Sequence, residues 1–218
     1  LFLLINHQWI ALSGFTGIFL IINLDIKNKY SGLNTKLQAM IPSDSIEWKA
    51  GLRKQFFFIL PIWFIAILSS FMIGSIPLAI IVIGIACVSY YEKCEPWQIL
   101  ISYESGPKKL LLLKIKRDLQ LFSVQILPLI GVFLIFHMER WYIPVAEYLI
   151  FCSLHIYLIV TKYSFFEASS KSAAAQTFSS IGFICCIIPV FLPLMWCLTI
   201  YFYIKSLNKL KPYLNDYN

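Results

Sequence analysis

The stretch ISYESGPKKLLLLKIKRDLQ, residues 101–120, gathers five basic side chains around a Gly-Pro break and lies between two long apolar regions. The five are Lys108, Lys109, Lys114, Lys116 and Arg117. A basic loop between apolar runs is typical of a membrane protein whose loop stays on the cytoplasmic side. We therefore interpret this stretch as a cytoplasmic loop that docks a partner.

The composition of the chain favours a membrane protein. Of its 218 residues, 59% are hydrophobic and only 13% are charged. Soluble globular domains are roughly half apolar and about one quarter charged. A chain with so few charged side chains has too little polar surface to remain in water, so we place it in a bilayer.

Six apolar runs, five of them without a charged residue, have the length of roughly 20 residues that a helix needs to cross the hydrocarbon core. They are residues 3–24, 55–71, 74–91, 119–137, 143–161 and 178–204. None alternates between polar and apolar residues, as the strands of a membrane β-barrel do. The predicted fold class is therefore all-α: a polytopic helical integral membrane protein, residues 1–218, with about six transmembrane helices in a single domain.

The chain begins with Leu1 inside an apolar run, without the positively charged segment and cleavage site of a signal peptide. We therefore expect it to be the C-terminal part of a longer chain. Its six cysteines form no CxxC pair, and five of them fall within predicted spans. This spacing predicts packing residues, with no metal, no cofactor and no disulfide.

Lysine and arginine are concentrated in the loops 27–54 and 92–118, which hold twelve of the eighteen. Short loops rich in these residues stay on the cytoplasmic side, so we expect both loops to face the cytoplasm from a bacterial inner membrane. Six crossings would then put the C-terminal tail outside, although it carries Lys205, Lys209 and Lys211. A re-entrant segment around residues 189–193 in place of a full crossing would remove that conflict.

Residues 44–56, DSIEWKAGLRKQF, are expected to form an interfacial elbow helix that leads directly into a span. Three apolar side chains recur at every fourth position, next to a basic stripe, as in an amphipathic helix on a membrane surface. The elbow residues are Trp48, Leu52, Arg53 and Phe56. The alternative is the ordinary first turn of a membrane helix.

The loop 92–118 is expected to contain two helices separated by a break. Glu95 and Pro96 favour a helix start, while Gly106 and Pro107 favour its end. A second helix then begins near Lys108 and runs into the next span. The alternative role for the lysines of this loop is binding of lipid headgroups.

The order of these pieces resembles that of ABC-2-type exporter permeases. The matching stretches are SIEWKAGLRKQF, the pair of spans over 55–91, and EPWQILISYESGPKKLLLLKIKRDL. The resemblance implies a short cytoplasmic coupling helix that docks into a separate ATPase subunit. No GxxxxGK[ST] motif is present, so ATP would be hydrolysed by that partner. The docking residues implied are Glu95, Trp97, Tyr103, Glu104, Gly106, Pro107, Lys108 and Lys109.

Two ionisable residues lie inside a predicted span, Glu147 and His155, eight positions apart on one helix. Ionisable groups in a membrane are costly and often mark a transport path. With Gln125 on the preceding span, they form a possible translocation path. Alternatively, Glu147 reaches the external interface and His155 bonds to a neighbouring helix.

The leading functional expectation is a non-catalytic permease subunit of an ATP-driven exporter, dimeric with itself or with a related chain. The two alternatives are an ATP-independent transporter or channel using Glu147 and His155, and a scaffold within a larger membrane complex. The chain contains no paired carboxylates, HExxH or GxSxG motif that would indicate an enzyme. Its net charge of +7 is explained by the inner loops, so lipids and an ATPase are the expected partners and nucleic acid is not.

Overall fold

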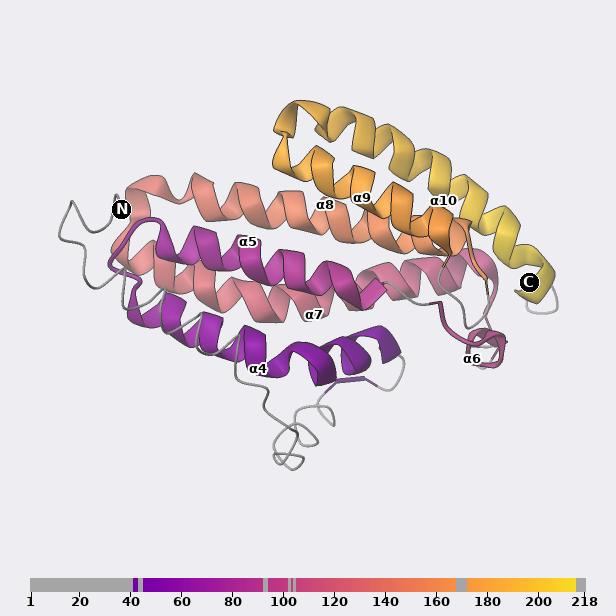
Figure 1. The fold of residues 1–218 in the computed structure, drawn as a ribbon, viewed down its shortest axis with the longest axis horizontal. Helices are drawn as coiled ribbons and strands as arrows, with labels where there is room; N and C mark the ends of the chain where they lie inside the picture. Colours follow the sequence, from indigo (N-terminus) through magenta and orange to yellow (C-terminus); the bar gives the residue numbers. More distant parts are fainter. Residues whose placement is uncertain are drawn as a thin grey trace.

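The computed structural model describes residues 41–42, 45–91, 94–101, 103, 105–167 and 172–214, and this part of the chain is helical without a β-strand (Figure 1). Its α-helices are α4 (Ile46–Leu68), α5 (Ser75–Val88), α6 (Trp97–Ile101), α7 (Pro107–Phe136), α8 (Tyr142–Ser164), α9 (Ala173–Ile187) and α10 (Leu192–Leu214). Short 3₁₀ turns occupy Ser89–Tyr91, Met138–Arg140 and Pro189–Phe191. The all-α class predicted from the sequence is confirmed. The first expected span, 3–24, lies outside the described residues.

Four described helices are long and apolar enough to cross a membrane, judged by length and composition. They are Ile46–Leu68, Pro107–Phe136, Tyr142–Ser164 and Pro189–Leu214. Two further apolar helices, Ser75–Tyr91 and Ala173–Ile187, are shorter. This pattern agrees with a helical membrane protein.

Helix α8 lies at the centre of the bundle, where it packs against α5, α7, α9 and α10. Two glycines allow helices to approach it closely. A Cβ on Gly84 of α5 would collide with the ring of Phe151, and a Cβ on Gly182 of α9 would collide with the ring of Tyr157. These contacts explain why glycine occupies both positions.

Helices α4 and α7 begin, and α8 and α10 end, at the same end of the bundle, beside α6 (Figure 1). We call this the basic end, because it lies next to the lysine-rich loop 92–118. Tyr213 near the end of α10 packs there against Phe166, which follows α8, at 5.5 Å between ring centroids. At the opposite, distal end, the turn after α4 meets the turn after α7, where His137 Nε2 lies 3.0 Å from the Ser70 carbonyl oxygen.

The stretch 178–204, expected to be a single span, is instead shared between two helices. Helix α9 ends at Ile187, a 3₁₀ turn beginning at Pro189 reverses the chain, and α10 runs back (Figure 1). Proline at this position lacks an N–H to continue the α9 hydrogen bonds. The hairpin places the C-terminal lysines at the basic end. This position agrees with the alternative in which a re-entrant segment around residues 189–193 replaces a full crossing.

Among the described residues of the expected elbow, 45–56, no separate helix is formed, because α4 is continuous from Ile46 to Leu68. The side chains of Trp48 and Phe56 are only 4% and 7% exposed, respectively. Trp48 packs edge-on against Tyr90, with ring centroids 5.2 Å apart. The apolar stripe that suggested a surface helix therefore faces the interior of the bundle.

Candidate functional site

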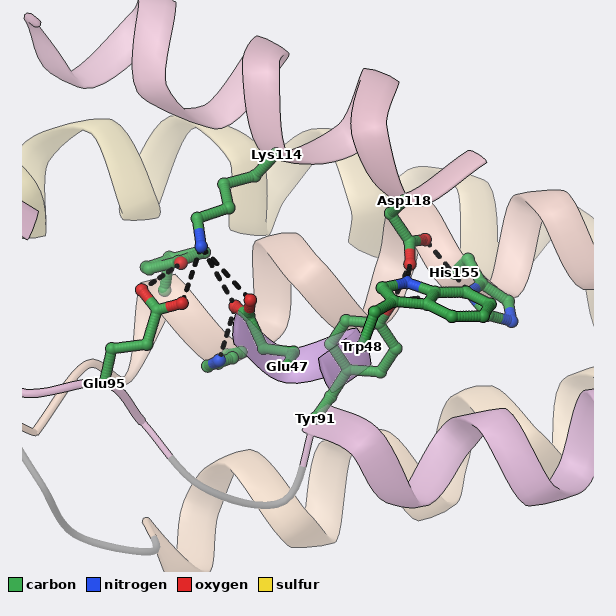
Figure 2. A network of polar contacts seen from close by, with 9 residues as sticks. Glu47, Trp48, Tyr91, Glu95, Lys114, Asp118 and His155 are labelled. Carbon is green, nitrogen blue, oxygen red and sulfur yellow. Dashed lines mark hydrogen bonds and ion pairs between the residues drawn. The ribbon is translucent and has the colours of Figure 1, made fainter. Parts of the chain in front are cut away.

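Two acidic and two basic side chains meet inside the basic end of the bundle, and Figure 2 labels three of them, Glu47, Glu95 and Lys114. Glu47 comes from the first turn of α4, Glu95 from the segment just before α6, Lys114 from α7 and Lys162 from the last turns of α8. We call these four the lysine–glutamate cluster. It connects three long helices to the segment that carries α6.

The distances within the lysine–glutamate cluster are those of ion pairs. Lys114 Nζ lies 2.6 Å from Glu95 Oε1 and 3.1 Å from Glu47 Oε2. Lys162 Nζ lies 3.0 Å from the other oxygen of Glu47. The hydroxyl of Tyr163 donates to Glu95 Oε2 at 3.1 Å. Every carboxylate oxygen of the cluster therefore has a donor.

The two positive and two negative charges of this cluster balance one another. The four side chains are at most 10% exposed. Burying a charge is costly unless it is paired, and removal of one partner leaves an uncompensated charge in the interior. Burial raises the pKa of Glu95, and the nearby carboxylate of Glu47 raises it further, while Lys162 and Lys114 act in the opposite direction. The two lysines thus oppose, without cancelling, the rise that burial and Glu47 cause in the pKa of Glu95.

A second group of polar side chains surrounds the buried carboxylate of Asp118 (Figure 2). Asp118 Oδ1 accepts hydrogen bonds from the indole N–H of Trp48 and the hydroxyl of Tyr91. Its other oxygen, Oδ2, lies 3.0 Å from His155 Nδ1, which donates to it. The imidazole of His155 also packs on Phe122, with ring centroids 4.4 Å apart. We call Trp48, Tyr91, Asp118 and His155 the Asp118 cluster.

The two clusters adjoin one another around a small cavity of about 20 Å³. Side chains of both clusters line it, including those of Glu47, Lys162, Trp48 and Asp118. A cavity of this size holds about one water molecule. It excludes any organic substrate, so the combined site is suited to holding helices together or to passing a proton rather than to chemistry on a bound molecule.

The spacing of residues on α7 and α8 produces this arrangement. On α7, Leu110, Lys114, Asp118 and Phe122 follow one another at intervals of four and are all buried. Side chains four apart lie on one face of a helix, so the two charged residues continue an apolar stripe. On α8, Lys162 is seven residues, or about two turns, beyond His155 and shares its face.

The docking residues expected from the sequence differ in their accessibility. Glu95 is 5% exposed, and Pro107 is buried as well. The ring of Tyr103, which is half-buried, has Lys114 Nζ 5.0 Å from its centroid. Glu95 and Tyr103 are therefore brought together around one lysine, inside the protein.

The remaining expected docking residues are more peripheral. Lys108 and Lys109 are exposed in the first turn of α7, next to the half-buried Gly106. Trp97 is the first residue of α6, but its side chain is outside the described part, as is all of Glu104. Of the expected elbow residues, Arg53 is exposed and Leu52 half-buried.

The residues of the expected translocation path do not form one site. The backbone oxygen of Gln125 accepts from Trp63 Nε1 at 3.2 Å, and its side-chain Oε1 lies 3.8 Å from Cys87 Sγ, so Gln125 faces α4 and α5. Glu147 is half-buried, and among the described residues it shares no hydrogen bond with Gln125 or His155. The partner of His155 is Asp118.

The sequence did not predict the central residues of the two clusters, Glu47, Lys114, Asp118 and Lys162, as site residues. Lys114 was noted only as one of the basic residues of the stretch 101–120. A usable signal was present, because Lys114 and Asp118 occur at the spacing of the buried face of α7. In the described residues, no group of three or more His, Cys, Asp or Glu could hold a metal ion, and the six cysteines are free.

Comparisons of the chain with protein-family models, with curated proteins and with solved structures give no match. The geometry of the two clusters is therefore the basis on which a function is assigned.

Proposed function

We propose that the chain is the non-catalytic permease subunit of an ATP-driven exporter, and that a separate ATPase acts on it through α6 and its flanking residues 94–107. The observation that supports this proposal best is the ion pair between Glu95, at the entry to α6, and Lys114 of α7. This pair ties a short helix outside the bundle to the long helices within it.

A docking element must be accessible to its partner. Part of the segment 94–107 is accessible. Pro96 and Gln98 are exposed, and α6 lies beyond the bundle beside the end of α10 (Figure 1). Glu95 is buried, so its role in docking would be to hold the segment in position rather than to touch the ATPase. The contact surface proposed is the outer face of α6.

The lysine–glutamate cluster offers a route by which a push on α6 would reach the spans. From Glu95 the contacts continue to Lys114 of α7, then to Glu47 of α4, and then to Lys162 of α8. Ion pairs are stronger in the low dielectric of a protein interior than in water. A displacement of α6 would therefore move these three helices together, as a rigid-body change between two states.

A transported molecule would also need a binding cleft, and one of about 560 Å³ lies between α5, α8 and α9. Gln176, Ser179 and Ser180 line one wall, and Ile85 and Val88 line another. This volume is within the range of sites for small molecules, which combine an apolar lining with a few polar groups. The mixed lining suits an amphipathic cargo.

Co-purification in mild detergent from native membranes, followed by mass spectrometry, tests the proposal. The native chain should retain an ATPase subunit, and the ATPase activity of the complex should be lost from preparations of Gln98→Arg. The control is Thr177→Arg, which places an arginine at an exposed position of α9 that does not line the cleft of about 560 Å³. Absence of an ATPase from every preparation, or its equal loss from both variants, would overturn the proposal.

The second candidate function, proton-coupled transport without an ATPase, is favoured by one observation. The Asp118–His155 pair is buried between helices and directly adjoins the lysine–glutamate cluster. Buried carboxylate and histidine groups in membrane helices often belong to proton relays. The purified chain, reconstituted alone in liposomes, should then acidify the liposome lumen when a proton gradient is imposed across the membrane. The variant His155→Gln should abolish this proton flux.

A further inference from the structure

The outer face of α7 at the basic end carries a long open groove. Its first part, about 690 Å³, is lined by Lys108, Lys109, Leu112, Lys116, Arg117 and Gln120, among others. It continues along the helix into a second part of about 740 Å³, which shares Leu112, Lys116 and Gln120 and adds Leu119 and Val124. The lining thus changes from basic to apolar along one helix.

Three exposed lysines line the basic part of the groove: Lys108, Lys109 and Lys116. Arg117 is half-buried and also lines the small cavity beside Glu47 and Asp118, and no carboxylate is among the described lining residues of the groove. Asp118, which belongs to the same helix, is turned inward and is 3% exposed. The charge of the groove is therefore complementary to an anion, and its positive side chains lie where the protein is expected to meet the cytoplasmic leaflet.

The length of the groove matches one leaflet of a bilayer. Lys108 and Val124 are sixteen residues apart, which corresponds to about 24 Å along an α-helix. Half of a bilayer, including its headgroups, is roughly 20–22 Å thick. Val124 and Leu112 are 73% and 51% exposed, so the far part of the groove presents apolar surface.

We propose that this face of α7 is a binding site for one anionic phospholipid of the leaflet at the basic end. The phosphodiester lies among Lys108, Lys109 and Lys116, and an acyl chain follows Leu112, Leu119 and Val124. A free phosphate would contact only the lysines, and an acidic segment of a partner protein would leave the apolar part uncovered. A phospholipid matches both parts, which assigns Lys108 and Lys109 to the membrane rather than to a docked ATPase.

Native mass spectrometry of the full chain, delipidated in detergent, tests the site by titration with dioleoyl phosphatidylglycerol. The triple variant Lys108→Gln, Lys109→Gln, Lys116→Gln should weaken binding of the first lipid at least tenfold, because each basic residue contributes about fivefold at an anionic surface. The control is Lys54→Gln, Lys209→Gln, Lys211→Gln, which removes the same charge from exposed positions elsewhere. It should change binding less than twofold.

Two further comparisons separate a lipid from other occupants. Leu112→Glu places a carboxylate in the middle of the groove and should weaken binding of phosphatidylglycerol by a similar factor, whereas inorganic phosphate at millimolar concentration should not displace the lipid. Dioleoyl phosphatidylcholine should bind the native chain and the triple variant equally. Equal affinity of both triple variants for phosphatidylglycerol, or its displacement by phosphate, would overturn the proposal. Equal affinity of both triple variants is the result expected if the groove is covered by residues 1–40, by a second copy of the chain or by a protein partner.

Discussion

Lys114 Nζ of α7 lies 2.6 Å from Glu95 Oε1. The ion pair therefore joins α7, the helix after α6, to Glu95, which lies just before α6. The two residues are nineteen positions apart in sequence, and α6 lies between them. The pair therefore fixes both ends of the α6 segment at one point. Any movement of α6 as a unit must either carry α7 with it or break a buried ion pair.

The variant Lys114→Met tests how much the lysine–glutamate cluster contributes to stability. Methionine keeps much of the length of the side chain but leaves Glu95 without its ion-pair partner on α7. Loss of one partner from a buried pair destabilises a protein by roughly 3–5 kcal/mol. At this chain length that corresponds to a fall in Tm of roughly 10 °C, measurable by thermal unfolding in detergent.

The exposed Lys108→Met makes the same change outside the cluster and should alter stability by no more than about 0.5 kcal/mol. Adding Glu95→Gln to Lys114→Met removes the unpaired charge and should restore part of the lost Tm. Equal Tm values for Lys114→Met and the native chain would mean that the ion pair does not hold the bundle together.

The Asp118 cluster can be tested by removing one donor and then its acceptor. Trp48→Phe keeps an aromatic ring but deletes the N–H that Asp118 accepts, and should cost about 1–3 kcal/mol. Asp118→Asn should cost more, because its amide replaces a carboxylate that accepts from Trp48, Tyr91 and His155. Denaturant unfolding of both variants measures which of them loses more free energy of unfolding. A more stable Asp118→Asn than Trp48→Phe would contradict the central role of the carboxylate.

The hairpin of α9 and α10 predicts that the C-terminal lysines lie on the same side as α6. In a Cys197→Ser background, Lys209→Cys and Gln98→Cys should react with a membrane-impermeant maleimide only after the cells are permeabilised. Glu139→Cys, in the turn at the distal end, should react in intact cells. Labelling of Lys209→Cys from outside would mean that α9 and α10 cross the membrane as one span.

The tip of this hairpin is predicted to lie within the hydrocarbon. Residues 187–191 contain no polar side chain, and Val190 is 81% exposed. Helix α9 has 15 residues, which correspond to about 22 Å against a hydrocarbon core of about 30 Å. A nitroxide on Val190→Cys should therefore be relaxed more by oxygen than by a water-soluble nickel chelate. The reverse preference, as expected for Glu139→Cys, would place the tip in water.

Much of the helical architecture could be predicted from the sequence, because apolar runs of suitable length are a direct consequence of the bilayer. The break within 178–204 was harder to predict. Its turn is as apolar as the helices on either side, and only Pro189 and Pro193 interrupt the run. Hydropathy alone cannot separate one long span from two short helices joined by an apolar turn.

The candidate site was predicted less well, for a different physical reason. Local pattern can indicate that Lys114 and Asp118 are buried, because they occupy positions of an apolar face. It cannot name their partners, since Glu47 is 67 residues from Lys114, and His155 is 37 residues from Asp118. These pairs form only after the helices pack. For this reason the sequence did not predict that Trp48, in the expected elbow helix, and Glu95, in the loop 92–118, both face the interior.

Photo-crosslinking from α6 is the most direct measurement of the central claim that a separate ATPase docks there. A benzophenone amino acid in place of Gln98 should crosslink, in native membranes, to a protein that carries a nucleotide-binding motif. The same group in place of Gln176 should not. Crosslinks from Gln98 to lipid alone, or the same protein partners from both positions, would contradict α6 as the docking element.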